Sequence, residues 1–306
     1  MFVINPDPYS LPCYRIGPFM TRDVSFNHLL PDNDLIDDYF VERFGNRGFL
    51  YTANGRKAIN IALSQFKLNK DDVVTILTTS GNFYISGCVT AEIEKFCRWS
   101  REIVRGTKVI LVNHEFGYPY RELKKLKEYG LPIIEDCASS FFSEDEERSI
   151  GEVGDYCIYS FPKMFPLQIG GLLVSNQNNR FYPEYKLGDT ELRYIKNVLS
   201  YYINDREDII RKRLYNYELL LDKFKSFGFS GRFENDGGVV PGAFMFRTDN
   251  VELDLPELKK YIWAHGIQCS VFYGEKTFFI PVHQALNEQD MLYFVEVMKS
   301  FIRKSG

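Results

Sequence analysis

The sequence predicts an α/β protein built on a mostly parallel sheet with helices on both of its faces. Between residues 49 and 175, short apolar runs that suit buried strands alternate with amphipathic stretches that suit helices. This alternation is typical of parallel sheets whose strands are joined by helical crossovers. Several of the apolar runs also end at a polar side chain, and open α/β sheets bind their ligands at the carboxyl ends of the strands.

Length and composition exclude several classes of protein. The 306 residues, 45% hydrophobic and 25% charged, suit a large globular domain with a smaller one beside it. The net charge of -4 gives no electrostatic reason to expect nucleic acid as a partner. The six cysteines include no CxxC pair, so we expect neither a zinc site nor a disulfide framework. Without a signal peptide or an apolar run of the roughly 18 residues that a membrane span needs, we expect a cytoplasmic protein without membrane contact.

The N-terminal part divides into an arm and the start of a large domain. Residues 1–35 are rich in Pro, Asp and Asn and predict an extended arm with short strands. We expect residues 36–180 to form the large α/β domain. Its first elements are a short amphipathic helix over 34–44, a strand over 49–53, and a helix that begins after Asn54 as its N-cap.

Strands and helices continue to alternate up to residue 175. The predicted strands are apolar and short, whereas the predicted helices are charged and amphipathic. The strands cover residues 71–77, 107–113, 131–136, 156–160 and 171–175, the helices cover 92–105 and 121–129, and a polar loop covers 143–155.

Residues 181–306 predict a smaller α+β domain at the C-terminal end. A long helical stretch over 192–227, with a break predicted near Asn204-Asp205, opens this domain. Shorter elements follow, with predicted strands over 239–246, 268–272 and 277–280 and predicted helices over 255–265 and 288–302.

Three polar side chains between residues 131 and 171 indicate a cofactor. Asp136 ends one apolar run, Ser160 ends the next, and Lys163 follows three residues later, ahead of a double glycine. Pyridoxal phosphate needs this combination of groups. A lysine forms its Schiff base, a carboxylate pairs with its pyridinium nitrogen, and hydroxyl and amide groups hold its phosphate.

Two further stretches supply candidate contacts for this cofactor. Gly55 opens a helix and is followed by Arg56 and Lys57, so free backbone amides and the helix dipole make an anion site there. An ordinary capped helix with a basic first turn has the same pattern. Phe83, with Tyr84 beside it, lies in a loop where an aromatic ring either stacks on a flat cofactor or belongs to the core.

The histidines carry less information. His114 follows the strand over 107–113 and either has a structural role or lies near the substrate, with Tyr84 as the second candidate substrate contact. His283 is expected to be structural.

Taken together, these motifs resemble the DegT/DnrJ/StrS family of fold-type-I pyridoxal-phosphate enzymes, known mostly as nucleotide-sugar aminotransferases. The family's Ser-Gly-Thr-x-Ala entry to a helix corresponds to residues 53–58, and its Asp-x-Ala corresponds to Asp136-Cys137-Ala138. Its Ser-Phe, Lys, Gly-Gly and Pro-x-His segments correspond to Ser160-Phe161, Lys163, Gly170-Gly171 and Pro281-Val282-His283. The resemblance covers residues 35–305.

The resemblance implies a role for each matched residue. Lys163 would form the aldimine with the cofactor and move the α-proton, and Asp136 would keep the pyridinium nitrogen protonated. The implied phosphate contacts are Gly55, Arg56 and Ser160, the implied ring contact is Phe83, and Lys57, Ala138 and Ser139 lie in the same pocket.

The implied activity is the transfer of an amino group, from glutamate by family habit, to a keto sugar on a nucleotide carrier, as in polysaccharide biosynthesis. A homodimer is also implied, because a second subunit usually completes the site. The chain departs from the family, however. Lys163 lies closer to Ser160 than in most members, and segments near residues 91–107 and 273–279 that shape the sugar-nucleotide pocket are short. A dehydratase or lyase on the same fold and a non-catalytic regulatory protein therefore stay open as alternatives.

Overall fold

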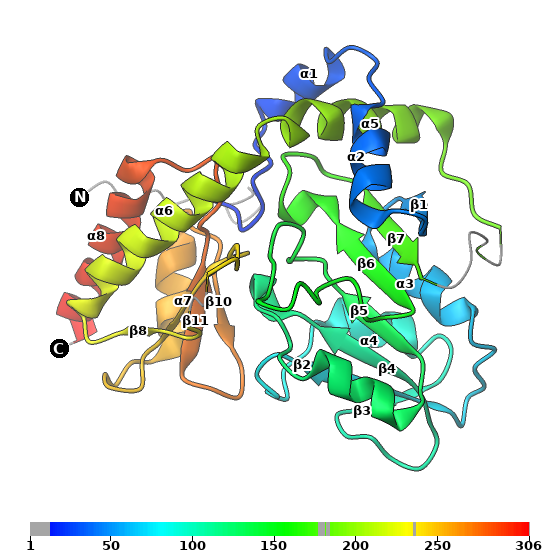
Figure 1. The fold of residues 1–306 in the computed structure, drawn as a ribbon. Coiled ribbons are helices and arrows are strands. Elements are labelled where there is room, and N and C mark those ends of the chain that lie inside the picture. The colour runs from blue at the N-terminus through cyan, green and yellow to red at the C-terminus, as the bar shows by residue number, and fades with distance from the viewer. Residues whose placement is uncertain (1–12, 177–180, 182–183, 235–236, 306) are drawn as a thin grey trace.

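The computed structural model describes residues 13–176, 181, 184–234 and 237–305. The chain forms a large sheet covered by helices and, beside it, a smaller unit of helices and short strands (Figure 1). The first part of the predicted N-terminal arm, residues 1–12, lies outside the described residues.

The large sheet has the strand order β1-β7-β6-β5-β4-β2-β3. Its central pairs, from β6 through β5, β4 and β2 to β3, are parallel, whereas β7 runs antiparallel to both β6 and β1. The mostly parallel sheet predicted from the sequence is therefore confirmed. The strands are β1 (Gly48–Thr52), β2 (Val73–Thr78), β3 (Arg98–Ser100), β4 (Thr107–Asn113), β5 (Ile133–Asp136), β6 (Tyr156–Ser160) and β7 (Gly171–Ser175).

Helices cover both faces of this sheet, as predicted. Alternate residues of a strand point to opposite faces, and the two buried clusters follow that rule. Ile158 packs in one cluster with α3 (Gly55–Ser64) and α4 (Gly87–Ile93). Tyr159 packs in the other with α2 (Leu35–Phe44) and α5 (Asp189–Ile203).

Two predicted elements are wrong, and a third takes a different form. The helix predicted over residues 92–105 ends at Ile93, and β3 follows it, because Arg98 to Ser100 pair with the open edge of β2. In residues 13–35 of the arm, α1 (Asp23–His28) forms in place of the predicted short strands, although Tyr14 makes an isolated parallel β-bridge with Ile267. The helix predicted over 121–129 is a 3-10 helix, Leu123–Tyr129.

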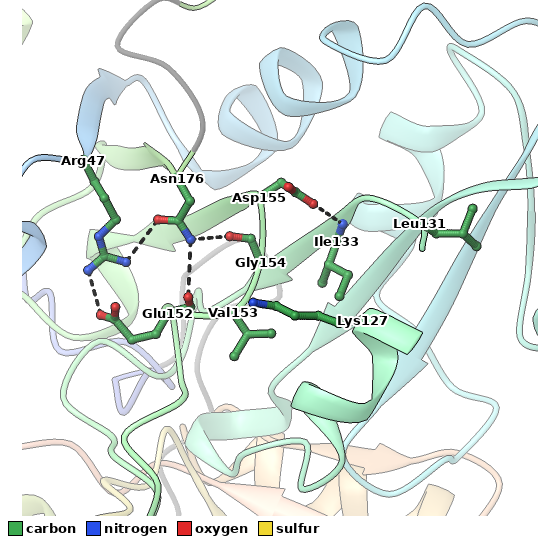
Figure 2. A pocket seen from close by; sticks show the side chains of 9 residues that line it. All are labelled: Arg47, Lys127, Leu131, Ile133, Glu152, Val153, Gly154, Asp155 and Asn176. Atoms are coloured by element: carbon green, nitrogen blue, oxygen red, sulfur yellow. Dashed lines mark hydrogen bonds and ion pairs between the residues drawn. The ribbon is translucent and has the colours of Figure 1, made fainter. Parts of the chain in front are cut away.

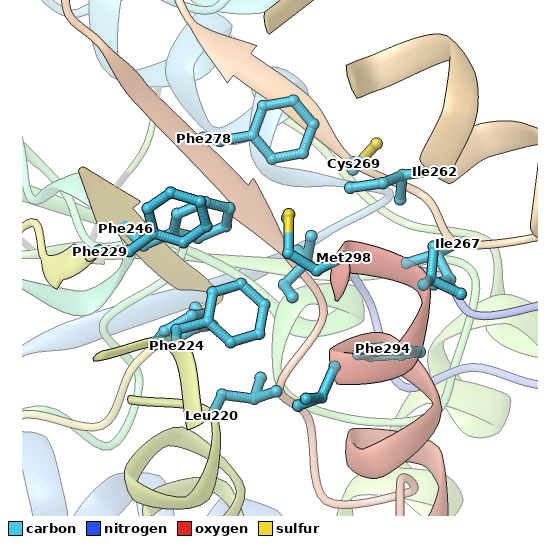
Figure 3. Packing of buried hydrophobic residues seen from close by; sticks show 14 of the residues in the cluster. Leu220, Phe224, Phe229, Phe246, Ile262, Ile267, Cys269, Phe278, Phe294 and Met298 are labelled. Atoms are coloured by element: carbon cyan, nitrogen blue, oxygen red, sulfur yellow. The ribbon is translucent and has the colours of Figure 1, made fainter. Parts of the chain in front are cut away.

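The smaller unit packs three helices against a four-stranded antiparallel sheet of order β10-β11-β9-β8. Its core is aromatic, with Phe224, Phe246 and Phe278 among the buried rings (Figure 3). The strands are β8 (Ser230–Gly231), β9 (Phe244–Arg247), β10 (Ser270–Phe272) and β11 (Thr277–Ile280), and the helices are α6 (Arg206–Lys225), α7 (Leu255–Ala264) and α8 (Glu288–Ser305).

The helical stretch after residue 188 belongs to two cores. The predicted break at Asn204-Asp205 is confirmed, because α5 ends at Ile203 and α6 begins at Arg206. Ile195 and Leu199 of α5 are buried with the large sheet, whereas α6 contributes Leu220 to the smaller core. No helix among the described residues is both long and apolar enough to cross a membrane.

Candidate active site

The candidate site lies where several strands of the large sheet end together. Asp136 is the last residue of β5, and its partner in the adjacent strand is Asn113, the last residue of β4. Ser160 ends β6 opposite Gly171 of β7. The first turn of α3 begins beside them, so the predicted phosphate segment and the predicted acid lie at one edge of the sheet.

Asp136 is a buried carboxylate, 4% exposed, that accepts hydrogen bonds only from neutral donors in the described chain. Asn113 Nδ2 donates to Oδ2 at 2.8 Å, and the backbone N–H of Ala138 donates to Oδ1 at 3.1 Å. Burial raises the pKa of Asp136 above its ordinary value, and these two bonds, with smaller contributions from His114 and then Lys163, only partly offset the increase. A cationic N–H group placed against this carboxylate would find acceptor capacity unused.

Glycines let the start of α3 approach the ends of β6 and β7. A Cβ on Gly55 would lie 3.2 Å from Ser160 Cβ. A Cβ on Gly171 would lie 2.8 Å from the carbonyl carbon of Asn54 and 2.9 Å from Gly55 N, both backbone atoms. Asn54 caps the helix by accepting from Lys57 N at 3.0 Å, which leaves the N–H groups of Gly55 and Arg56 without intrahelical acceptors. The structure thus brings Ser160 to an open helix N-terminus, a geometry that suits an anion.

Lys163 ends a single 3-10 turn, Phe161–Lys163, that follows β6 directly. Its side chain is exposed in the described chain, and its charge acts on the pKa of Asp136. The short spacing from Ser160 therefore still places the lysine near the predicted acid.

The other predicted cofactor residues differ in their exposure and contacts. The side chain of Arg56 is exposed, whereas Lys57 Nζ lies 4.9 Å from the ring centroid of Tyr185. Ala138 and Ser139 are half-buried just after β5. Two glycines pack close to Ser139: a Cβ on Gly117 would lie 3.2 Å from its carbonyl oxygen, and a Cβ on Gly242 would lie 3.3 Å from its Cβ.

The two candidate aromatic residues differ in their surroundings. Phe83 is 75% exposed. Tyr84 is half-buried, and its ring lies 5.2 Å from that of Phe272 and 5.8 Å from that of Tyr273, centroid to centroid. The loop that carries both is tied to the smaller unit, because Asn82 Nδ2 donates to Glu275 at 2.7 Å.

His114 lies in the interior and not in the cleft. It is 1% exposed, its Nε2 lies 3.1 Å from a carboxylate oxygen of Glu135, and its Nδ1 accepts from Tyr120 N at 3.1 Å. Both ring nitrogens are thus occupied, which favours the structural alternative over the substrate contact. His283 is likewise buried, and its Nε2 lies 3.0 Å from the carbonyl oxygen of Arg15.

Asn113 is the site residue that sequence reasoning missed. Its signal was available, because it ends the apolar strand that precedes the strand of Asp136. Two consecutive parallel strands that both end in a polar residue place those residues side by side when the strands are neighbours.

A separate surface hollow of about 500 Å³ opens near the beginnings of β5 and β6, at the opposite edge of the sheet (Figure 2). Its polar groups bind one another: Arg47 pairs with Glu152 at 2.7 Å, and Asp155 accepts from Ile133 N at 2.7 Å. None of the predicted site residues lines it.

Comparison with known proteins identifies the fold first. The chain has the fold of the fold-type-I pyridoxal-phosphate transferases. It superposes on the aminotransferase TlmJ from Streptoalloteichus hindustanus with a TM-score of 0.73 at 15% identity, covering 92% of this chain and 94% of that one. The GDP-4-keto-6-deoxy-D-mannose-3-dehydratase of E. coli, solved with hydrated pyridoxal phosphate, gives a TM-score of 0.68 at 15% identity, covering 94% and 100%.

Part of the sequence is similar to a known family. Residues 97–182 match the DegT/DnrJ/EryC1/StrS aminotransferase family, which confirms the predicted resemblance. A protein of Micromonospora echinospora described as an L-glutamine:3-amino-2,3-dideoxy-scyllo-inosose aminotransferase is 27% identical over 176 residues, which are 50% of this chain and 42% of that protein. The chain thus matches less than half the length of the curated relatives it resembles.

Proposed function

We propose that this protein is a pyridoxal-phosphate-dependent aminotransferase that moves an amino group, from glutamate, to a nucleotide-linked keto sugar. The observation that carries the proposal is the buried carboxylate of Asp136, which has neutral donors, a raised pKa and a lysine close by. Burying a carboxylate without a cation is costly. A cofactor whose ring nitrogen carries a proton would remove that cost.

The residues present fit this cofactor. Asp136 would hold the proton of the ring nitrogen, and the first turn of α3 with Ser160 would hold the phosphate, because Gly55 and Gly171 let that turn approach the ends of β6 and β7. Bound there, pyridoxal phosphate would supply an aldehyde that exchanges amino groups and a ring that accepts electrons. The Nζ of Lys163 would be the covalent attachment point and would move the proton during transfer.

The substrate rests on relatives and not on contacts. Part of the chain matches the aminotransferase family, and the chain is similar to a protein named as an inosose aminotransferase. Both matches support a keto sugar as the amino acceptor. The resemblance to the family supports a nucleotide carrier, glutamate as the donor and a homodimer that completes the site. A cytoplasmic location stays a prediction as well.

Covalent trapping tests the central claim. Purified protein with added pyridoxal phosphate should develop the visible absorption of a lysine-bound cofactor, and borohydride should fix the cofactor's mass on the peptide that contains Lys163. Lys163→Ala should abolish both signals. Lys127→Ala is the matched control, because Lys127 lies beside the hollow at the opposite edge of the sheet. If the wild-type protein binds no cofactor covalently, the proposal is wrong and the regulatory alternative gains support.

A second measurement distinguishes transfer from elimination, because a dehydratase shares this fold. Addition of glutamate alone should bleach the visible band as the cofactor takes up the amino group, with 2-oxoglutarate released. Conversion of a keto-sugar substrate into a deoxygenated sugar with loss of water, and without an amino sugar as product, would favour the dehydratase. Sedimentation of the loaded protein would check the predicted homodimer.

A further inference from the structure

The turn that carries Lys163 is held by side chains from outside the large sheet. Arg213 Nη2 donates to the carbonyl oxygen of Lys163 at 2.9 Å, and Gln284 Nε2 donates to that of Met164 at 2.7 Å. Asn27 Nδ2 of α1 donates to the carbonyl oxygen of Pro166 at 2.7 Å. Three carbonyl groups within four residues are therefore bound from α6, from the segment after β11 and from α1.

Arg213 is an unusual residue to use for this purpose. It is fully buried, and no carboxylate in the described chain pairs with it. Its Nε donates to Gln284 Oε1 at 2.8 Å, and its Nη1 donates to the carbonyl oxygen of Pro241 at 3.1 Å. Burial lowers the pKa of Arg213 to about 9. A buried charge without a counter-ion is expensive, and an apolar side chain of similar size is often at least as stable, so global stability does not explain the arginine.

The backbone of the turn decides where the amine of Lys163 lies. Among the described residues, no hydrogen bond or ion pair holds its Nζ. The turn itself is tight, since the N–H groups of Met164 and Phe165 both donate to the carbonyl oxygen of Phe161, at 3.0 and 2.8 Å. Fixing the carbonyls of Lys163 and Met164 therefore fixes the direction in which the lysine side chain leaves the turn.

Resting on the proposed function, we propose that Arg213 and Gln284 are positioning residues that orient Lys163 for covalent bonding to the cofactor. The pair binds the two consecutive carbonyls through one connected hydrogen-bond network. A reacting group that is misplaced by about 1 Å can lose a hundredfold in rate.

A purely structural role for these residues is the alternative, and Asn216 provides the matched control. Asn216 lies on the same helix, is equally buried, and donates to the carbonyl oxygens of His283 at 3.3 Å and Leu286 at 3.1 Å. It therefore holds the segment that contains Gln284 but binds none of the carbonyls of the lysine turn.

The experiment compares two forms of the cofactor on Arg213→Met, Arg213→Lys, Gln284→Ala and Asn216→Ala. Pyridoxal phosphate reports covalent bonding, through the rate at which the visible band appears. Pyridoxamine phosphate has an amine in place of the aldehyde and reports binding alone, by titration. Thermal unfolding of the cofactor-free proteins confirms that each variant is folded.

We expect Arg213→Met and Gln284→Ala to slow covalent bonding by about tenfold to a hundredfold while the affinity for pyridoxamine phosphate changes by less than about threefold. Arg213→Lys should recover part of the rate because it retains a donor. Asn216→Ala should lower the unfolding temperature without slowing the reaction.

Three results would overturn the inference. Wild-type rates in Arg213→Met and Gln284→Ala would do so, as would an equal loss of affinity for both cofactor forms or an equal slowing by Asn216→Ala. Should Arg213→Met fail to fold, Arg213→Lys and Gln284→Ala still decide the question. A wild-type protein that binds pyridoxamine phosphate but never forms the visible band would instead refute the proposed function and the positioning role together.

Discussion

Glu135 and Asp136 are adjacent on β5 and equally buried, yet their carboxylates have opposite surroundings. Glu135 accepts backbone N–H groups from Gly151, Val153 and Gly154 at 2.5 to 2.9 Å and also contacts His114. Although burial raises the pKa of Glu135, these hydrogen bonds hold it below the ordinary value. Asp136 accepts from just two donors in the part of the chain that the structure describes, both neutral, and burial raises its pKa.

This difference in hydrogen-bond donors distinguishes a structural carboxylate from one that can still bind a ligand. The polar loop of residues 149–154 wraps around Glu135, so its acceptor capacity is used within the chain. Glu135, His114 and Cys137 also lie close enough together to resemble metal ligands, but the bound N–H groups make a structural cluster the simpler interpretation. Asp136 faces the other side of the sheet, where α3 begins, and keeps capacity for a cation.

The largest effect on stability is expected from Glu135→Gln. The amide nitrogen would face backbone N–H donors of the loop, and each buried donor that it leaves unsatisfied costs about 1–3 kcal/mol. The free energy of unfolding in urea measures the loss. Because the pKa of Glu135 is lowered by folding, its stabilisation is complete above the ordinary value of 4.5. The deficit of the variant should therefore shrink as the pH falls through the lowered pKa.

Glu152→Gln is the matched control for that change. Glu152 lies in the same loop and pairs with Arg47, but its side chain is 50% exposed, so its loss should cost less than about 1 kcal/mol. Equal losses from the two substitutions would show that Glu135 does not organise the loop.

Asp136→Asn should behave in the opposite way. The cofactor-free protein should lose little stability. Asn113 and Ala138 donate to different oxygens, so one hydrogen bond is lost, but the amide also removes a charge that burial disfavours. Folding raises the pKa of Asp136, so the wild-type protein loses stability as the pH rises through that raised pKa. The variant lacks this loss and should gain stability relative to the wild type over the same pH range.

The same variant should be strongly impaired with cofactor. Without the carboxylate, the ring nitrogen loses its charged partner, and we expect turnover to fall about a hundredfold, by analogy with the loss of other charge-stabilising groups in active sites. Single-turnover reaction with glutamate measures this effect. If Asp136→Asn unfolds as easily as Glu135→Gln while reacting normally, the two carboxylates do not differ in the way proposed here.

The sequence could predict the strand ends but not the donors that reach them. Asp136 and Ser160 were recognisable because each ends an apolar run, and Gly55 because it opens a helix. Nothing local distinguishes Glu135, since its donors lie 16 to 19 residues further along the chain.

Residues that link the two units could not be recognised from the sequence either. Arg213 lies in a helical stretch with charged residues, and nothing in that pattern distinguishes it from its charged neighbours. Its burial depends on how α6 packs against the turn of Lys163. β3 was mistaken for helix because a three-residue edge strand leaves too short a pattern, and its pairing with β2 decides its structure.

The smallest effect should come from Asn113→Ala, which removes one of the two donors to Asp136. The pKa of Asp136 should rise further, because the Asn113 hydrogen bond is among the interactions that lower it. A hydrogen bond to a charged group contributes about 1.5 kcal/mol or more, so affinity for pyridoxal phosphate should fall about tenfold, with the deficit growing at lower pH as Asp136 takes up a proton. Asn60→Ala is the control, because Asn60 Nδ2 donates to the carboxylate of Glu92 at 3.2 Å in another part of the domain. Equal affinities of the two variants at every pH would mean that Asn113 has no influence on the carboxylate beside it.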